Sequence, residues 1–219
     1  MYFAYCCAMM TQELFFGLCG FALVSSITPG PNNLMLMASG TNFGFARTLP
    51  HMLGVSIGFV LMTVLIGLGL AQVFVRFPVA YTVLKVGSVV YLIYLAWKIA
   101  TAAAPKADAA ATAKPFSFLQ ACLFQWVNPK AWTMALMSVT AYVPADHPML
   151  GLLVVAAVFG AINLPTVGLW AFLGMQMRQF LHDPVKLRAF NVIAALTLLA
   201  SLYPVVTHDL LAHPGLATP

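Results

Sequence analysis

Long apolar runs, separated by short polar or proline-containing stretches, fill most of this chain. A helix that crosses a bilayer needs about 20 predominantly apolar residues, and six runs reach that length. The segments are apolar nearly all round, so helical periodicity adds little to this reading. The pattern therefore predicts six transmembrane helices, at Leu14–Ala38, Leu49–Phe74, Phe77–Ile99, Phe116–Ala141, Met149–Met175 and Leu187–Thr207.

Two of these runs contain residues that are unfavourable inside a membrane helix. The first holds Thr28-Pro29-Gly30-Pro31-Asn32-Asn33, and the fourth holds Asn128-Pro129-Lys130. Proline removes a backbone donor and breaks the helical hydrogen-bond ladder. In lipid, the freed carbonyl has no water to accept from. We therefore predict that the first and fourth helices are broken near the midplane of the bilayer, with a structural kink as the alternative.

The positions of the breaks indicate an inverted repeat. Three helices precede the alanine- and lysine-rich stretch 101–115, so the second set of three starts from the opposite face. Pro29 lies about 15 residues into its run and Pro129 about 13, which places both about 20 Å deep at about 1.5 Å per residue. We expect an all-α membrane protein whose inverted three-helix repeats are residues 14–100 and 116–208. Residues 101–115 are the expected cytoplasmic linker, 1–13 an N-terminal extension and 209–219 a C-terminal tail.

Composition and charge agree with this reading. The 219 residues are 62% apolar and 7% charged, which excludes an ordinary soluble domain. By the positive-inside rule the loops after the first, third and fifth helices are cytoplasmic, which places both termini outside. The net charge of +5 then needs no nucleic-acid partner. No Cys-x-x-Cys and no histidine at ligand spacing occurs, so we expect neither a metal nor another cofactor. The cations of those loops are Arg47, Lys98, Lys106, Lys114, Arg178, Lys186 and Arg188.

The chemistry of the breaks favours a zwitterionic ligand. Gly30-Pro31 and Asn128-Pro129 each resemble a helix restart, because proline suits the first helical position. The positive ends of both new helices would then face a shared anion. Lys130 places a positive charge at the positive end of its own helix, which is unfavourable. The carboxylate of a bound substrate would offset this cost. The alternatives for Lys130 are snorkelling and pairing with a backbone carbonyl.

Ten residues are candidates for substrate binding, although each polar one could instead simply bond between helices. No acidic residue lies deep in any run, so a substrate ammonium would meet carbonyl and amide oxygens. His51 is a candidate for proton coupling, with an interfacial histidine as the alternative. Gly54 and Gly58 permit close helix approach, within one protomer or in a homo-oligomer. The ten are Thr28, Gly30, Pro31, Asn32, Asn33, Gln125, Asn128, Pro129, Lys130 and Asn163.

The same stretches resemble the LysE/RhtB family of amino-acid exporters. The similarity runs from about Leu14 to the sixth helix, and the first break with Gly40, Gly44, Arg47 and Gly54 resembles the family signature. The resemblance implies a six-helix inner-membrane exporter of amino acids, driven by the proton gradient, and not an enzyme. Small neutral amino acids are favoured, because no acidic residue lies deep in a run. Further similar stretches are Leu84-Lys85-Val86-Gly87, Tyr91-Leu92, Trp97-Lys98 and 124–132.

Together these features predict an exporter that works by alternating access between two inverted halves in a lipid bilayer. A membrane thiol or electron carrier using Cys19 and Cys122 is one alternative, although neither cysteine stands at a break. A membrane hydrolase or transferase would need clustered ionisable groups, which the runs lack. A structural membrane subunit is the remaining alternative, and it gives no reason for two breaks.

Overall fold

The computed structural model describes residues 10–101, 114–177 and 183–203. Every regular element within these ranges is helical, which confirms the predicted all-α class for this part of the chain. Residues 1–9, most of the expected linker and the expected C-terminal tail lie outside the described ranges. The elements are α2 (Gln12–Ile27), α3 (Pro31–Phe43), α4 (Phe45–Leu65), a π-helix (Ile66–Leu70), α5 (Ala71–Arg76), α6 (Pro78–Ala100), α8 (Phe118–Val127), α9 (Pro129–Tyr142), α10 (Pro148–Met177) and α11 (Pro184–Ala200).

Among the described residues, three continuous helices are long and apolar enough to cross a membrane. They are Phe45–Arg76, α6 and α10, and the pair α2 and α3 also qualifies as one span bent by 54°. The α8, α9 and α11 helices are shorter, at 10, 14 and 17 residues. These apolar helices make the chain a multi-pass membrane protein, while the count of six spans stays a prediction.

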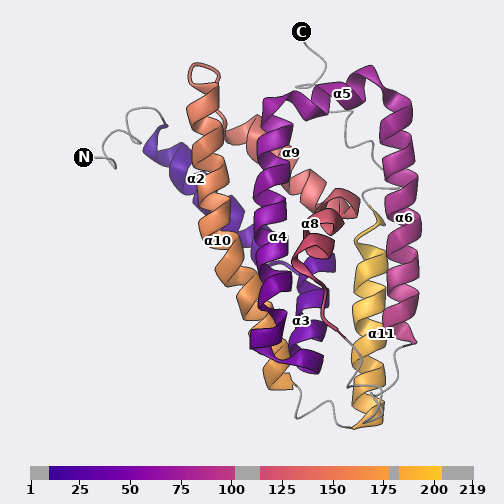
Figure 1. Cartoon of the computed structure of the whole chain (residues 1–219). Helices are drawn as coiled ribbons and strands as arrows, with labels where there is room; N and C mark the ends of the chain where they lie inside the picture. The colour runs from indigo at the N-terminus through magenta and orange to yellow at the C-terminus, as the bar shows by residue number, and fades with distance from the viewer. Residues whose placement is uncertain (1–9, 102–113, 178–182, 204–219) are drawn as a thin grey trace.

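The predicted boundaries are close for α6 and α10, but the second span differs in two ways. Its helix begins at Phe45 instead of Leu49, because Gly44 adopts a φ of 78° and turns the chain directly from α3 into α4. Glycine reaches this left-handed conformation without strain. The helix also contains a kink at Gly69, where φ is 108° within the π-helix. Beyond the kink, α5 crosses toward α6 (Figure 1).

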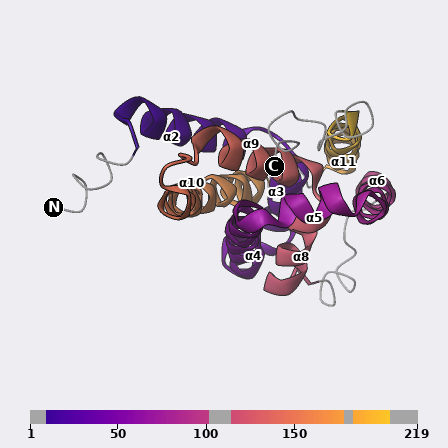
Figure 2. The ribbon, with the colours of Figure 1, turned by 90° about the horizontal axis from the view of Figure 1, so that it is seen from above.

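The two interrupted segments lie among the long helices and run in opposite directions. In Figure 1 the chain descends through α2 and α3, and it rises through α8 and α9. The α10 helix packs against α2, α3 and α4, whereas α8 packs against α4. The α6 and α11 helices form a pair on one flank of the bundle (Figure 2).

Glycines allow the closest of these helix contacts. A Cβ on Gly40 of α3 would collide with the carbonyl of Ala171 in α10, and one on Gly174 would collide with the carbonyl of Met37. On α4, a Cβ on Gly58 would lie 2.7 Å from the Cα of Cys122 in α8. The predicted Gly-x-x-x-Gly contact is therefore confirmed, and it lies within one protomer.

Candidate functional site

Both predicted helix interruptions are present. The α2 helix ends at Ile27 and α3 begins at Pro31, while α8 ends at Val127 and α9 begins at Pro129. Each new helix thus has proline at its first position, where its missing N–H is not needed. Asn128 caps α9, because its side chain accepts from the backbone N–H of Lys130 at 3.1 Å. Gly30 offers α3 no side-chain cap.

The carbonyl groups at the end of α2 would be orphaned by the break, and nearby donors satisfy them. The backbone N–H of Thr28 donates to Val24 at 3.1 Å, and its hydroxyl donates to the carbonyl of Ser25 at 3.0 Å. The Asn33 amide donates to the carbonyls of Ser26 and Thr28, both at 2.8 Å. The side chains of the break thus cap α2 from its C-terminal side.

Two donors from distant helices complete this cap. Trp170 of α10 donates its indole N–H to the carbonyl of Ile27 at 3.1 Å. The Nζ of Lys130 lies 2.5 Å from the carbonyl oxygen of Thr28, 2.9 Å from its hydroxyl and 3.5 Å from the carbonyl oxygen of Pro29. Lys130 therefore pairs with backbone carbonyls, which is one of the alternatives that the sequence left open. A cation at the negative end of α2 is electrostatically favourable.

The contact between Lys130 and Thr28 links the two interrupted segments, and a pair of side-chain amides links them a second time. Asn32 of α3 donates to the Gln125 Oε1 at 2.8 Å, and the Gln125 Nε2 lies 3.3 Å from the Asn32 Oδ1. The same Nε2 donates to the carbonyl of Ala121 at 2.8 Å. Asn32 and Lys130 each occupy the second position of a restarted helix, and each reaches the segment before the other break. The contacts between the two interrupted segments are thus reciprocal.

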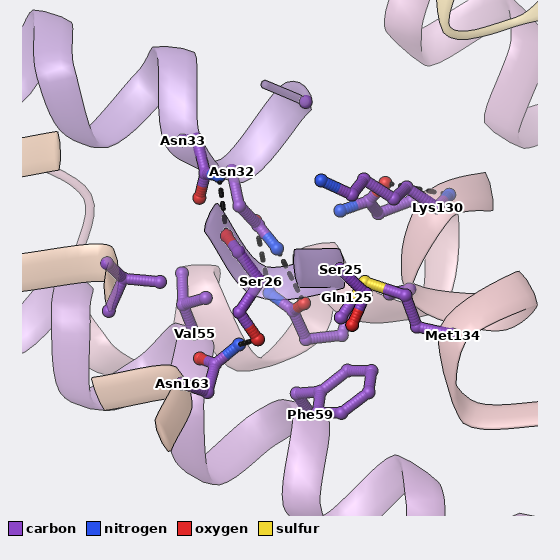
Figure 3. A pocket seen from close by; sticks show the side chains of 14 residues that line it. Ser25, Ser26, Asn32, Asn33, Val55, Phe59, Gln125, Lys130, Met134 and Asn163 are labelled. Carbon is purple, nitrogen blue, oxygen red and sulfur yellow. Dashed lines mark hydrogen bonds between the residues drawn. The ribbon is translucent and has the colours of Figure 1, made fainter. Parts of the chain in front are cut away.

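These polar groups surround a cavity of about 20 Å³ (Figure 3). A cavity of roughly 10–15 Å³ holds one water molecule, so this cavity is far too small for an amino acid. Seven of the ten predicted residues line it, while Thr28, Pro31 and Pro129 shape the chain beside it. The lining is Ser25, Ser26, Gly30, Asn32, Asn33, Val55, Phe59, Gln125, Asn128, Lys130, Ala131, Met134, Asn163 and Val167.

Asn163 brings α10 into the cavity. Its amide donates to the Ser26 hydroxyl at 3.2 Å, and its Oδ1 is buried with no hydrogen-bond partner among the described residues. A buried acceptor without a partner suits a ligand or water that donates to it. Ser25 and Ser26 also line the cavity but are not among the predicted residues, although two adjacent hydroxyls before a break in an apolar run were a usable signal.

His51 lies apart from the cavity. Its side chain is 2% exposed, and neither ring nitrogen has a hydrogen-bond partner within the described ranges. The ring packs against Phe116, with 5.3 Å between centroids. His51 is thus buried within the protein against the segment before α8, while both its role in coupling and its position relative to the membrane interface stay predictions.

Other candidate features lie outside the polar cavity. A hollow of about 440 Å³ runs along α6 beside Lys85 and contains none of the predicted site residues. The thiols of Cys19 and Cys122 are free, and neither lines the cavity. The acidic residues of the described part are Glu13, Asp146 and Asp183, and all three are exposed near helix ends.

Comparison with known proteins agrees with these features. A family model described as LysE type translocator matches residues 23–201. The cysteine/O-acetylserine efflux protein of Escherichia coli strain K12 is 29% identical over 191 residues, covering 86% of this chain and 95% of that protein. The protein of the same name from Shigella flexneri is also 29% identical, with the same coverage. No solved structure matches the chain.

Proposed function

Because the chain belongs to the family of LysE type translocators, we propose that it exports small zwitterionic amino acids from the cytoplasm. A translocator moves its solute without transforming it, so the chain is a transporter and not an enzyme. The two relatives named above are called cysteine/O-acetylserine efflux proteins, which makes small neutral amino acids of this kind the cargo to test first. The observation that carries the proposal is the meeting of two interrupted helices at one polar cavity.

The proposed architecture has six spans in two inverted repeats in the inner membrane, with both termini outside. The interrupted helices run in opposite directions (Figure 1), and their cross-links are reciprocal. In transporters built this way, the substrate sits at the repeat interface near the midplane. In this architecture α8 and α9 together form the fourth span and α11 forms the sixth. Each of these helices is shorter than a full span in the described residues.

The proposed site holds the substrate carboxylate at the start of α3, with Lys130 as its counter-ion. Gly30 and Pro31 contribute no side-chain acceptor, so the N–H groups at the positive end of α3 are left for a ligand. Lys130 lies beside Gly30, since a Cβ there would be 3.2 Å from Nζ. The amides of Asn32, Asn33, Gln125, Asn128 and Asn163 line the rest, and Thr28 and Pro129 fix the breaks.

Export would proceed by alternating access. The cavity is too small for an amino acid in this conformation, so the two halves must separate to admit one. The Lys130–Thr28 and Asn32–Gln125 contacts would part during that movement. His51 is the proposed proton carrier for coupling, because its buried ring nitrogens are free to bind a proton.

Efflux from loaded cells tests this proposal. Cells that overproduce the protein should lower their internal pool of labelled cysteine or O-acetylserine faster than vector controls, and should tolerate toxic analogues better. Unchanged pools for every neutral amino acid, with the protein present in the membrane, would reject the export function.

A further inference from the structure

We infer that the Lys130 ammonium occupies a subsite that the substrate's own ammonium takes over during export. The subsite consists of the carbonyl oxygens of Thr28 and Pro29 and the Thr28 hydroxyl. This inference rests on the proposed export function, and it specifies how an amino group is recognised without an acidic side chain.

The geometry around Nζ suits a primary ammonium. An ammonium has three N–H donors, and three oxygens lie at 2.5, 2.9 and 3.5 Å from Nζ. Two of these oxygens belong to the backbone just beyond the last turn of α2, where the helix dipole is negative. This cluster would favour any primary ammonium, whether it belongs to Lys130 or to a ligand.

Lys130 is suited to leave this cluster. Its backbone stands in the first turn of α9, and its flexible stem passes over Gly30 to reach the far side of the gap. A carboxylate at the start of α3 would attract Nζ away from Thr28, and the released oxygens would accept the ammonium of the same substrate. A zwitterion carries both charges, so it can complete this exchange without leaving a charge unpaired.

A ligand can also reach the cluster. Thr28 and Pro29 are exposed, whereas Gly30 and Asn128 beside them are buried. The exposure of these two residues leaves one side of the cluster open to a ligand that approaches from outside the buried part of the site. The cluster therefore faces the path by which a substrate would enter.

This recognition makes a free amino group a requirement for export. O-acetylserine and N-acetylserine are isomers, but only the first retains an ammonium. Wild-type protein should export O-acetylserine and leave N-acetylserine inside the cell. Equal export of both isomers would overturn the subsite while preserving the export function.

Chemical rescue tests the subsite without any transport. In purified Lys130→Ala protein, ethylammonium should raise the melting temperature saturably, because it binds the folded state where Nζ was. Tetramethylammonium, which has no N–H, should have no such effect at the same concentration. Wild-type protein and the Lys85→Ala variant should not respond, since their Lys130 fills the cluster.

The two experiments separate the possible failures. Absence of rescue and export of N-acetylserine would each reject the subsite. If Lys130→Ala does not fold, the comparison of isomers in wild-type protein decides alone. Failure to export O-acetylserine or any other neutral amino acid, together with rescue by ethylammonium, would reject the export function and keep an ammonium site.

Discussion

The Nζ of Lys130, at the start of α9, lies 2.5 Å from the carbonyl oxygen of Thr28, at the end of α2. These residues are 102 positions apart, and each stands at a helix interruption. The bond joins the two interrupted segments where their half-helices meet. In this conformation the carbonyl oxygens of Thr28 and Pro29 supply the partial negative charge beside Lys130, where the sequence predicts a substrate carboxylate.

Replacing Lys130 with methionine should nearly abolish export while the protein still inserts and folds. The change keeps an apolar stem and removes the ammonium that pairs with Thr28 or with a substrate carboxylate. A hydrogen bond to a charged group contributes about 1.5–3 kcal/mol, and its loss corresponds to about 10- to 150-fold weaker binding. Efflux of labelled O-acetylserine measures the effect, and Lys85→Met is the matched control that should retain activity. Normal efflux by Lys130→Met would remove this lysine from the site.

Gly30→Ala should reduce export in the same direction without removing any charged group. The new Cβ would lie 2.7 Å from the Lys130 Cδ and push the side chain from its present path. Overpacking of this kind costs about 1–3 kcal/mol. Gly20→Ala in α2 is the control, because nothing lies within 4 Å of its Cβ position. Equal efflux by the two variants would show that the path of Lys130 over Gly30 has no functional role.

Asn32 and Gln125 should prove energetically coupled. Their amides bond reciprocally at 2.8 and 3.3 Å, and Gln125 is fully buried. We expect a double-mutant cycle with alanine to give a coupling of about 0.5–3 kcal/mol. Thermal unfolding of the purified variants measures it. Strictly additive losses would mean that the amide pair does not connect the interrupted segments.

Gly40→Ala and Gly174→Ala should each destabilise the fold, because a Cβ at either position collides with a backbone carbonyl of the facing helix. The expected loss is about 1–3 kcal/mol or more, since backbone cannot move aside as a side chain can. Melting temperatures in detergent, compared with Gly20→Ala, test this. Unchanged stability would contradict the close approach of α3 and α10.

His51→Phe should separate transport from proton coupling. Phenylalanine keeps an aromatic ring to pack against Phe116 but cannot bind a proton. In proteoliposomes, exchange of substrate for substrate should continue, whereas a pH gradient should no longer drive accumulation. Retained pH-driven accumulation would assign the coupling to another group.

The sequence predicted the two interruptions and half of the residues that line the cavity, because these residues are unusual within apolar runs. Proline, asparagine and lysine inside an apolar run have few explanations other than a break or a site. Pairing partners were harder to predict. Which carbonyl Lys130 reaches depends on how α2 and α9 cross, and helices that are apolar all round carry no pattern that fixes their neighbours.

The kink at Gly69 and the early start of α4 were even harder to predict from the sequence. Glycine is common in membrane helices, so Gly69 did not stand out from the glycines that serve close packing. The start of α4 was placed too late because Arg47 was assigned to a loop. In the structure Arg47 lies within α4, with its guanidinium 5.5 Å from the Phe43 ring centroid.

The small size of the polar cavity has a consequence for the cell that carries this protein. The cavity of about 20 Å³, bordered by the Lys130 and Asn32 contacts, has room for no more than a water molecule or two in this conformation. An exporter that rests in this conformation would not conduct ions or metabolites through this cavity. A cell could then keep such an exporter abundant at rest without losing solutes through it.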